Sequence, residues 1–79
     1  MIKVTKADYL SGYVLLLTFS DGAVKSFDFS TVYNEGICIK LQDLAYFRNF
    51  RLDPFSVDWN NEIGFAPEFL YENGTPMTI

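Results

Sequence analysis

The stretch from Tyr13 to Phe29, YVLLLTFSDGAVKSFDF, constrains the fold of this 79-residue chain more than any other. It opens with seven uncharged residues whose β-branched and aromatic flanks favour a strand over a helix. Asp21-Gly22 follows, and this pair is a strong turn signal because Gly accepts a positive φ and Asp tolerates one. The stretch therefore predicts a β-hairpin that turns at residues 20–22.

The length of the hairpin loop decides which side chains share a face. A two-residue loop pairs Ser20 with Ala23 and places Phe27 and Phe29 with Val14, Leu16 and Thr18. A three-residue loop pairs Phe19 with Ala23 and gathers these side chains on one face: Tyr13, Leu15, Leu17, Phe19, Phe27 and Phe29. The opposite face then carries Thr18, Val24, Ser26 and Asp28. Because a slip of one residue moves every side chain to the wrong side, we expect the three-residue loop, with Gly22 left-handed in a bulge.

Residues 1–8 alternate between apolar and polar, which predicts a half-buried strand before a turn at Ser11-Gly12. This strand and the hairpin would form a three-stranded antiparallel meander. Lys3 and Lys6 would then protect its edge from pairing with other chains. After the meander, Ser30 is expected to cap one helical turn over residues 31–33, and the alternation in residues 37–41 predicts a short extended segment.

The second half of the chain predicts two short helices and a second hairpin. Asp43 is a good N-cap for a helix over residues 43–49. Asp53-Pro54 is expected to turn strand 50–52 back into strand 56–59, with another turn at Asn60-Asn61. Pro67-Glu68 opens the last helix, which ends at Asn73-Gly74. Residues 75–79 are expected to be a frayed tail. The prediction is one α+β domain over residues 1–79.

Composition limits where such a chain is expected to work. Its single cysteine, Cys38, cannot form an intrachain disulfide, whereas small secreted domains usually carry several. The sequence shows neither a signal peptide nor an apolar run of the length that spans a bilayer. We therefore expect a soluble cytoplasmic protein without a membrane partner. The abundance of aromatic residues, 18% of the chain, also suggests a sticky surface and a possible homodimer.

The net charge of −4 is unevenly spread along the chain. Residues 1–51 are nearly balanced, whereas residues 52–79 contain no Lys or Arg and carry five acids: Asp53, Asp58, Glu62, Glu68 and Glu72. Nucleic acids are bound chiefly by neutralising phosphates, so this acidic third argues against direct nucleic-acid binding. It mildly favours a basic partner surface, while the favoured alternative is that the acids simply keep a small aromatic domain in solution.

The inventory of reactive side chains is poor for catalysis. The chain has no His, the side chain best suited to proton transfer near neutral pH. Cys38 lies between two isoleucines and is expected to be an inert thiol. Asp53, Asp58 and Glu62 are expected to be turn and surface acids, with no sign of a cleft between them. The chain offers neither a zinc ligand set nor a phosphate-binding glycine loop. We therefore expect no enzyme, no cofactor and no metal.

Binding to another protein remains the leading hypothesis. Aromatic residues ringed by acids can anchor a partner, and Trp and Tyr dominate interface hot spots. The candidate partner-binding residues are Trp59, Glu62, Phe65, Glu68 and Tyr71. For Trp59, packing in the core is the favoured alternative. A second hypothesis is a small-molecule-binding or enzymatic domain with a pocket between the sheet and the helix that begins at Pro67.

Three segments together resemble a known family: FSDGAVKSFDF, LQDLAYF and FRLDPFSVDWNNEIGFAPEFLY. They are similar in order and spacing, over residues 4–71, to the small bacterial family named domain of unknown function twenty-four forty-two. The chain departs from the family pattern after Trp59, where Asn60-Asn61-Glu62 replaces a usual Trp-Pro-Asn-Gly. The resemblance implies a compact α+β domain with an antiparallel sheet, short helices and no established activity.

The resemblance also bears on the biological role. Members of the family stand alone or precede a helix-turn-helix segment, and their genes are suspected of belonging to toxin–antitoxin or regulatory pairs. These 79 residues leave no room for a helix-turn-helix. A regulatory role would therefore act through a partner protein. The sequence as a whole predicts a non-enzymatic interaction or regulatory module that uses its acidic, aromatic C-terminal third.

Overall fold

The expected hairpin forms the centre of an antiparallel sheet in the computed structural model, which describes residues 1–77. The strands are β1 (Val4–Ser11), β2 (Val14–Phe19), β3 (Val24–Asp28) and β7 (Thr75–Pro76), in the order β1-β2-β3-β7. A second, three-stranded sheet and several short helices complete an α+β fold. The predicted meander and fold class are confirmed.

The loop of the hairpin has three residues, as the hydrophobic pattern predicted. The Phe19 N–H donates to the Ala23 carbonyl oxygen over 2.8 Å, and Gly22 has a φ of 90°. Leu15 consequently faces Phe27 across the two strands. The side chains of Leu15, Leu17, Phe19, Phe27 and Phe29 are all buried, while Tyr13 is half-buried.

Strand β1 does not keep the simple alternation expected for residues 1–8. Its pairing with β2 shifts between Val4 and Lys6 and again between Tyr9 and Ser11. The first irregularity adds one residue, so Val4 faces Phe19 while Ala7 faces Leu17. A β-bulge of this kind bends the strand and increases its twist. Lys3 and Lys6 are both exposed.

The second sheet contains the predicted second hairpin and one further strand. Its members are β4 (Arg51–Leu52), β5 (Val57–Trp59) and β6 (Ile63–Gly64), all antiparallel. Asn60 and Asn61 join β5 to β6 with φ angles of 56° and 58°. Asn adopts this left-handed region more readily than most residues, so the sequence that replaces the usual family pattern still makes a tight turn.

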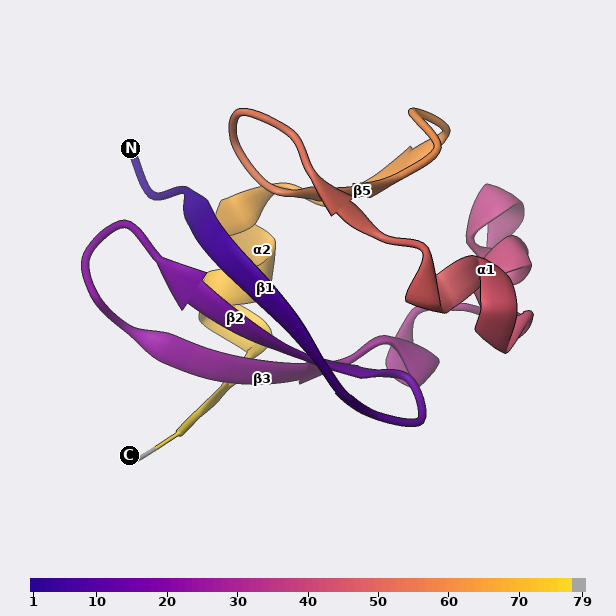
Figure 1. The fold of residues 1–79 in the computed structure, drawn as a ribbon, viewed down its shortest axis with the longest axis horizontal. Helices are drawn as coiled ribbons and strands as arrows, with labels where there is room; N and C mark the ends of the chain where they lie inside the picture. The colour runs from indigo at the N-terminus through magenta and orange to yellow at the C-terminus, as the bar shows by residue number, and fades with distance from the viewer. Residues whose placement is uncertain (78–79) are drawn as a thin grey trace.

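The two predicted α-helices are present with the expected caps. Helix α1 (Leu44–Arg48) is capped by Asp43, whose carboxylate accepts the Ala45 N–H over 3.0 Å, and it ends at Asn49. Helix α2 (Pro67–Asn73) begins with proline, whose missing N–H costs nothing at this position. In Figure 1, α2 lies behind the main sheet, β5 above it and α1 at its right-hand end.

The segment between the sheets differs from the prediction in two ways. The single turn η1 (Phe29–Thr31) is capped by Asp28 rather than by Ser30. Residues 37–41 are not extended, because they lie within a 3-10 helix, η2 (Gly36–Gln42). The inward-facing residues of this segment are half-buried Cys38 and buried Leu41, three apart. A spacing of three matches the 3.0 residues per turn of a 3-10 helix and not the period of a strand.

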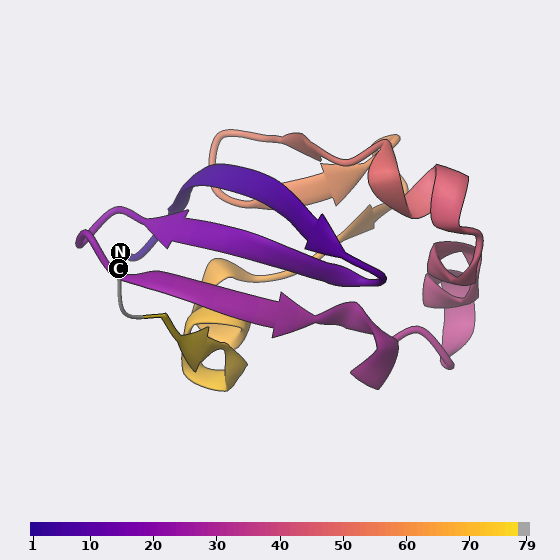
Figure 2. The ribbon, with the colours of Figure 1, turned by 60° about the horizontal axis from the view of Figure 1, so that its bottom comes forward.

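The prediction of a frayed tail is wrong for residues 75–77, and residues 78–79 lie outside the described residues. Thr75 and Pro76 pair with Ser26 and Lys25 as β7, and the Met77 N–H donates to the Val24 carbonyl oxygen over 2.9 Å. Figure 2 shows β7 following α2 at the edge of the main sheet. The C-terminal segment therefore closes part of the free edge of β3.

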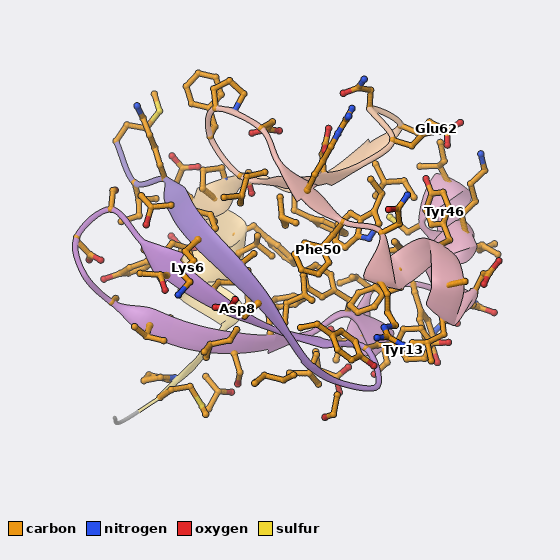
Figure 3. All side chains as sticks on the ribbon, viewed as in Figure 1. Lys6, Asp8, Tyr13, Tyr46, Phe50 and Glu62 are labelled. Atoms are coloured by element: carbon orange, nitrogen blue, oxygen red, sulfur yellow. The ribbon has the colours of Figure 1, made fainter. Side chains whose placement is uncertain are left out.

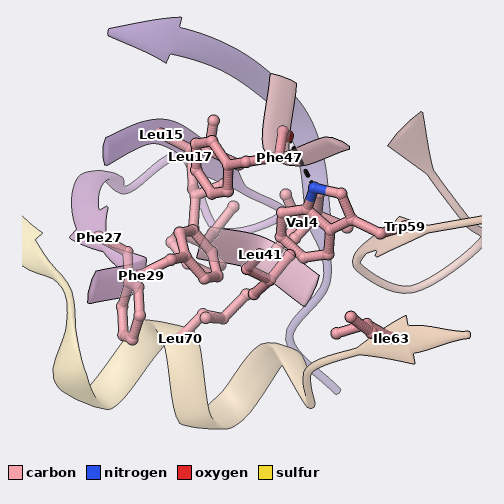
Figure 4. Packing of buried hydrophobic residues seen from close by; sticks show 12 residues of the cluster. Val4, Leu15, Leu17, Phe27, Phe29, Leu41, Phe47, Trp59, Ile63 and Leu70 are labelled. Carbon is pink, nitrogen blue, oxygen red and sulfur yellow. Dashed lines mark hydrogen bonds between the residues drawn. The ribbon is translucent and has the colours of Figure 1, made fainter. Parts of the chain in front are cut away.

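One hydrophobic core lies between the two sheets and the helices (Figure 4). The Trp59 ring stacks on Phe47 with centroids 5.7 Å apart and meets the edge of Phe29 at 5.2 Å. Large aromatic side chains bury much area each, which suits a domain of this size. The fully buried side chains come from both halves of the chain: Leu15, Leu17, Phe19, Phe29, Leu41, Phe47, Val57, Trp59 and Leu70.

Candidate functional site

The five candidate partner-binding residues do not form one surface. Trp59 is fully buried and Phe65 packs against the core. Tyr71 is half-buried, whereas Glu62 and Glu68 are exposed. The aromatic members therefore lie largely inside the molecule. The alternative that the sequence favoured for Trp59, packing in the core, is what the structure shows.

Trp59 also satisfies its polar atom internally. Its indole Nε1–H donates to the Phe47 carbonyl oxygen over 2.7 Å, the dashed line in Figure 4. This bond joins β5 to the last turn of α1. A buried donor and acceptor that lose each other cost about 1–3 kcal/mol, so Trp59 is tied to the core by hydrogen bonding as well as by packing.

Glu62 belongs to a surface network that joins three elements. Its carboxylate accepts from Lys40 Nζ over 3.0 and 3.1 Å and from the Tyr46 hydroxyl over 3.1 Å. Figure 3 shows Tyr46 and Glu62 close together at one end of the molecule. The hydrogen bond from Lys40 and that from Tyr46 lower the pKa of Glu62, and Glu62 in turn raises the pKa of Lys40. Glu62 is therefore held ionised, and the Lys40 ammonium compensates its charge.

Tyr71 is likewise held by residues of the first hairpin. Its hydroxyl donates to Asp21 Oδ2 over 2.6 Å, while Lys25 Nζ donates to the Tyr71 carbonyl oxygen over 2.6 Å. The same ammonium lies 3.8 Å from the centre of the Tyr71 ring. The bond to Tyr71 lowers the pKa of Asp21 and raises that of Tyr71. These contacts fasten α2 to the turn between β2 and β3.

Asp53, Asp58 and Glu62 line one shallow depression of about 260 Å³ beside β6. Asp53 accepts the N–H groups of Phe55 and Ser56, so it holds the turn before β5. Asp58 is only 6% exposed, which corrects its expected place as a turn or surface acid, and it accepts from Arg51 Nε over 3.1 Å. Within residues 1–77, no group of His, Cys, Asp and Glu has an arrangement that could hold a metal ion.

Cys38 is half-buried on η2. Burial raises the pKa of its thiol, and the Glu35 carboxylate raises it further. Lys40, the one cation near it in sequence, is occupied by Glu62. The environment therefore favours the neutral thiol over the reactive thiolate.

A groove of about 410 Å³ lies between β3 and α2. Phe27 and Phe69 form its aromatic part, with ring centroids 5.7 Å apart. Phe27 is almost fully buried, whereas Phe69 is 39% exposed. The other lining residues are Val14, Ser26, Asp28, Thr31, Asn73 and Thr75. The volume lies in the range of ligand pockets, although five of the eight lining residues are polar.

Hydrogen bonds within the fold hold the polar groups of the groove in place. Asp28 Oδ1 accepts the Ser30 N–H over 2.9 Å, and the Thr31 hydroxyl donates to the Asp28 carbonyl oxygen over 2.8 Å. On α2, Asn73 Nδ2 donates to the Phe69 carbonyl oxygen over 2.9 Å. Phe69 and Asn73 are four apart and so share one side of the helix.

The sequence did not single out Asp28 or Asn73 as candidate site residues. It placed Asp28 on the outer face of the hairpin with Ser26, and it placed Asn73 at the end of the last helix. No local pattern could show that the two residues line the same groove, because they are 45 positions apart in the chain. Phe69 was not among the candidate partner-binding residues either.

None of the helices within residues 1–77 has the length and apolar character needed to cross a membrane.

The fold and the groove define a small α+β domain in which two antiparallel sheets share one core. The sequence matches the family described as Protein of unknown function (DUF2442) over residues 4–76. The chain belongs to this family, as the resemblance of its motifs predicted. Neither the curated proteins nor the solved structures include a match to the chain.

Proposed function

We propose that this chain is a non-enzymatic interaction or regulatory module that binds another protein through the exposed side of α2. The observation that carries the proposal is that α2 presents two acids, Glu68 and Glu72, together with the exposed aromatic ring of Phe69. Both acids are exposed, and neither has an ion-pair partner within residues 1–77. Phe69 is 39% exposed between them and borders the groove beside β3.

The distribution of charge supports α2 over the rest of the acidic third. Asp58 and Glu62 are paired with Arg51 and Lys40, so they present little free charge to a partner. Glu68 and Glu72 form no such ion pair within residues 1–77, so their charges are available to a partner. A surface with one sign of charge steers a partner of the opposite sign and raises its rate of association. Exposed aromatic residues are common where such surfaces become buried.

The narrower form of the proposal, a part in a toxin–antitoxin pair, is supported by the family resemblance alone. Binding to a partner is the step that every form of the proposal needs.

The proposal is tested by affinity capture from an extract of the native cell, together with light scattering of the purified chain. Glu72→Lys should capture several-fold less partner than the wild type at low salt, because it places a like charge against a basic surface. Glu35→Lys is the matched control: it makes the same charge change at an exposed acid that precedes η2 and does not line the groove. High salt should weaken the wild-type interaction.

Equal loss in both variants would show that only net charge matters and would contradict binding at α2. A chain that stays monomeric and captures nothing at either salt concentration would contradict the proposal as a whole.

A further inference from the structure

We propose that the groove between β3 and α2 receives a basic side chain, lysine or arginine, from the partner protein. This inference rests on the proposed function and names the chemistry that the partner would present. The occupant follows from three features of the groove: its charge, its apolar walls and its polar rim.

Among residues 1–77, Asp28 is the one charged residue that lines this groove, and it is exposed. Its Oδ1 accepts the Ser30 N–H, while Oδ2 has no hydrogen-bond or ion-pair partner within residues 1–77. Lys25, the nearest cation along β3, is turned to Tyr71 by the 2.6 Å hydrogen bond and the ring contact. The carboxylate is thus held in place and has an oxygen free for an incoming cation.

The walls suit the aliphatic part of a long basic side chain. Phe27, Phe69 and Val14 provide apolar surface along the groove. Lys and Arg bury their methylene stems on such surface while the charged head group stays at the polar end. The exposed ring of Phe69 can also attract a cation through its π-face.

The rim supplies acceptors for the remaining N–H groups of the cation. Ser26, Thr31 and Thr75 carry hydroxyl oxygens, and Asn73 keeps its amide oxygen because Nδ2 is the atom used within the helix. An anion could accept hydrogen bonds from the hydroxyl groups, but it would lie against the like charge of Asp28. The combination selects an ammonium or a guanidinium group over an acidic or purely apolar occupant.

The experiment is an NMR titration of the full ¹⁵N-labelled chain with blocked tripeptides, acetyl-Gly-X-Gly-amide, in which X is Arg, Lys or citrulline. Citrulline has the shape of Arg without its charge. We expect saturable shifts of the amide signals of Asp28, Phe69 and Asn73 with Arg or Lys, and much smaller shifts with citrulline. The ratio of the Arg and Lys affinities identifies the preferred head group.

Asp28→Asn should weaken binding of the Arg or Lys peptide roughly tenfold, as expected for the loss of one charge-assisted hydrogen bond. Asn also caps helical turns, so η1 should remain formed. Asp43→Asn is the matched control, because Asp43 caps α1 through the same kind of bond and lies away from the groove. It should bind like the wild type.

The absence of saturable shifts would overturn the inference, as would equal binding of citrulline or equal effects of the two Asn variants. Other results distinguish a failure of this inference from a failure of the proposed function. If the peptides do not bind but Glu72→Lys still loses the captured partner, only the occupant of the groove is wrong. If the peptides bind but no partner is captured, the proposed function is wrong and the groove remains a site for cations.

Discussion

Tyr71 was a candidate for partner binding because it is an aromatic residue in the acidic C-terminal third. In the structure its side chain stabilises the fold instead. Its ring packs edge-on against Phe19 at 5.0 Å, its hydroxyl reaches Asp21, and its face receives Lys25. The hydrogen bond to Asp21 favours the ionised carboxylate and the neutral phenol together. Asp21 therefore has a lowered pKa and Tyr71 a raised one.

The stability that this bond provides should depend on pH in a defined way. It is complete above the ordinary Asp pKa of 3.8 and below the ordinary Tyr pKa of 10.0. It is lost as the pH falls through the lowered pKa of Asp21 and as the pH rises through the raised pKa of Tyr71. Tyr71→Phe should therefore be less stable than the wild type near neutral pH, and the difference should shrink at both extremes.

Urea midpoints measured across the pH range check this prediction. Tyr33→Phe is the control, since the Tyr33 hydroxyl makes no hydrogen bond within residues 1–77. Its stability difference from the wild type should not vary with pH. A pH-independent difference for Tyr71→Phe would show that the bond to Asp21 does not stabilise the fold.

The connection from α2 to β7 depends on a close approach of two backbones. A Cβ atom at Gly74 would lie 2.8 Å from the Leu70 carbonyl oxygen and 3.0 Å from Lys25 Cβ. The Leu70 carbonyl oxygen is a backbone atom, so it cannot move away from the added Cβ atom as the end of a flexible side chain could. Glycine at this position lets the chain leave α2 and pair at once with β3.

Gly74→Ala should destabilise the protein by about 1–3 kcal/mol, the usual cost of forcing extra atoms into a packed site. The displaced segment should also lose protection of the Met77 N–H from hydrogen exchange. Gly64→Ala is the matched control, because a Cβ atom there meets nothing within 4 Å. Equal effects of the two substitutions on urea unfolding would contradict the close approach.

At the scale of the whole molecule, the second sheet depends on the first. Its strands have two or three residues each, and its inward side chains, Val57, Trp59 and Ile63, are buried in the shared core. Short hairpins are at best marginally stable alone in water. The two sheets should therefore unfold together.

We expect a single urea transition in which Trp59 fluorescence reports the second sheet and far-ultraviolet circular dichroism reports the whole backbone. The two curves should coincide within error. Tryptophan fluorescence that changes at lower urea concentration than the dichroism would show that the second sheet unfolds first and would contradict a shared core.

Local signals predicted much of this architecture. The Asp21-Gly22 turn, the Asp43 cap and the Pro67 start each depend on neighbours within a few residues. For that reason they were right. The strand at residues 75–76 and the bulges of β1 depend instead on contacts with distant segments, and no local pattern announced them.

The candidate site was harder to predict for the same reason. The sequence shows which residues are acidic or aromatic, but it does not show which acids meet a cation. Glu62 and Asp58 form ion pairs with Lys40 and Arg51, so their charges are not available to a partner. Trp59 and Phe65 pack in or against the core. Glu68, which the sequence had named, stays exposed together with Phe69 and Glu72, and the groove beside Phe69 depends on α2 lying next to β3.

The bulges of β1 also bear on whether the outer strand can pair with the same strand of another molecule. A long, flat outer strand is a template for fibril growth, and a sheet as rich in apolar residues as this one would be at risk. Here the outer strand is kinked at both ends and carries the exposed pair Lys6 and Asp8, while β7 covers part of the opposite border. Stacking of successive molecules strand upon strand is thereby discouraged.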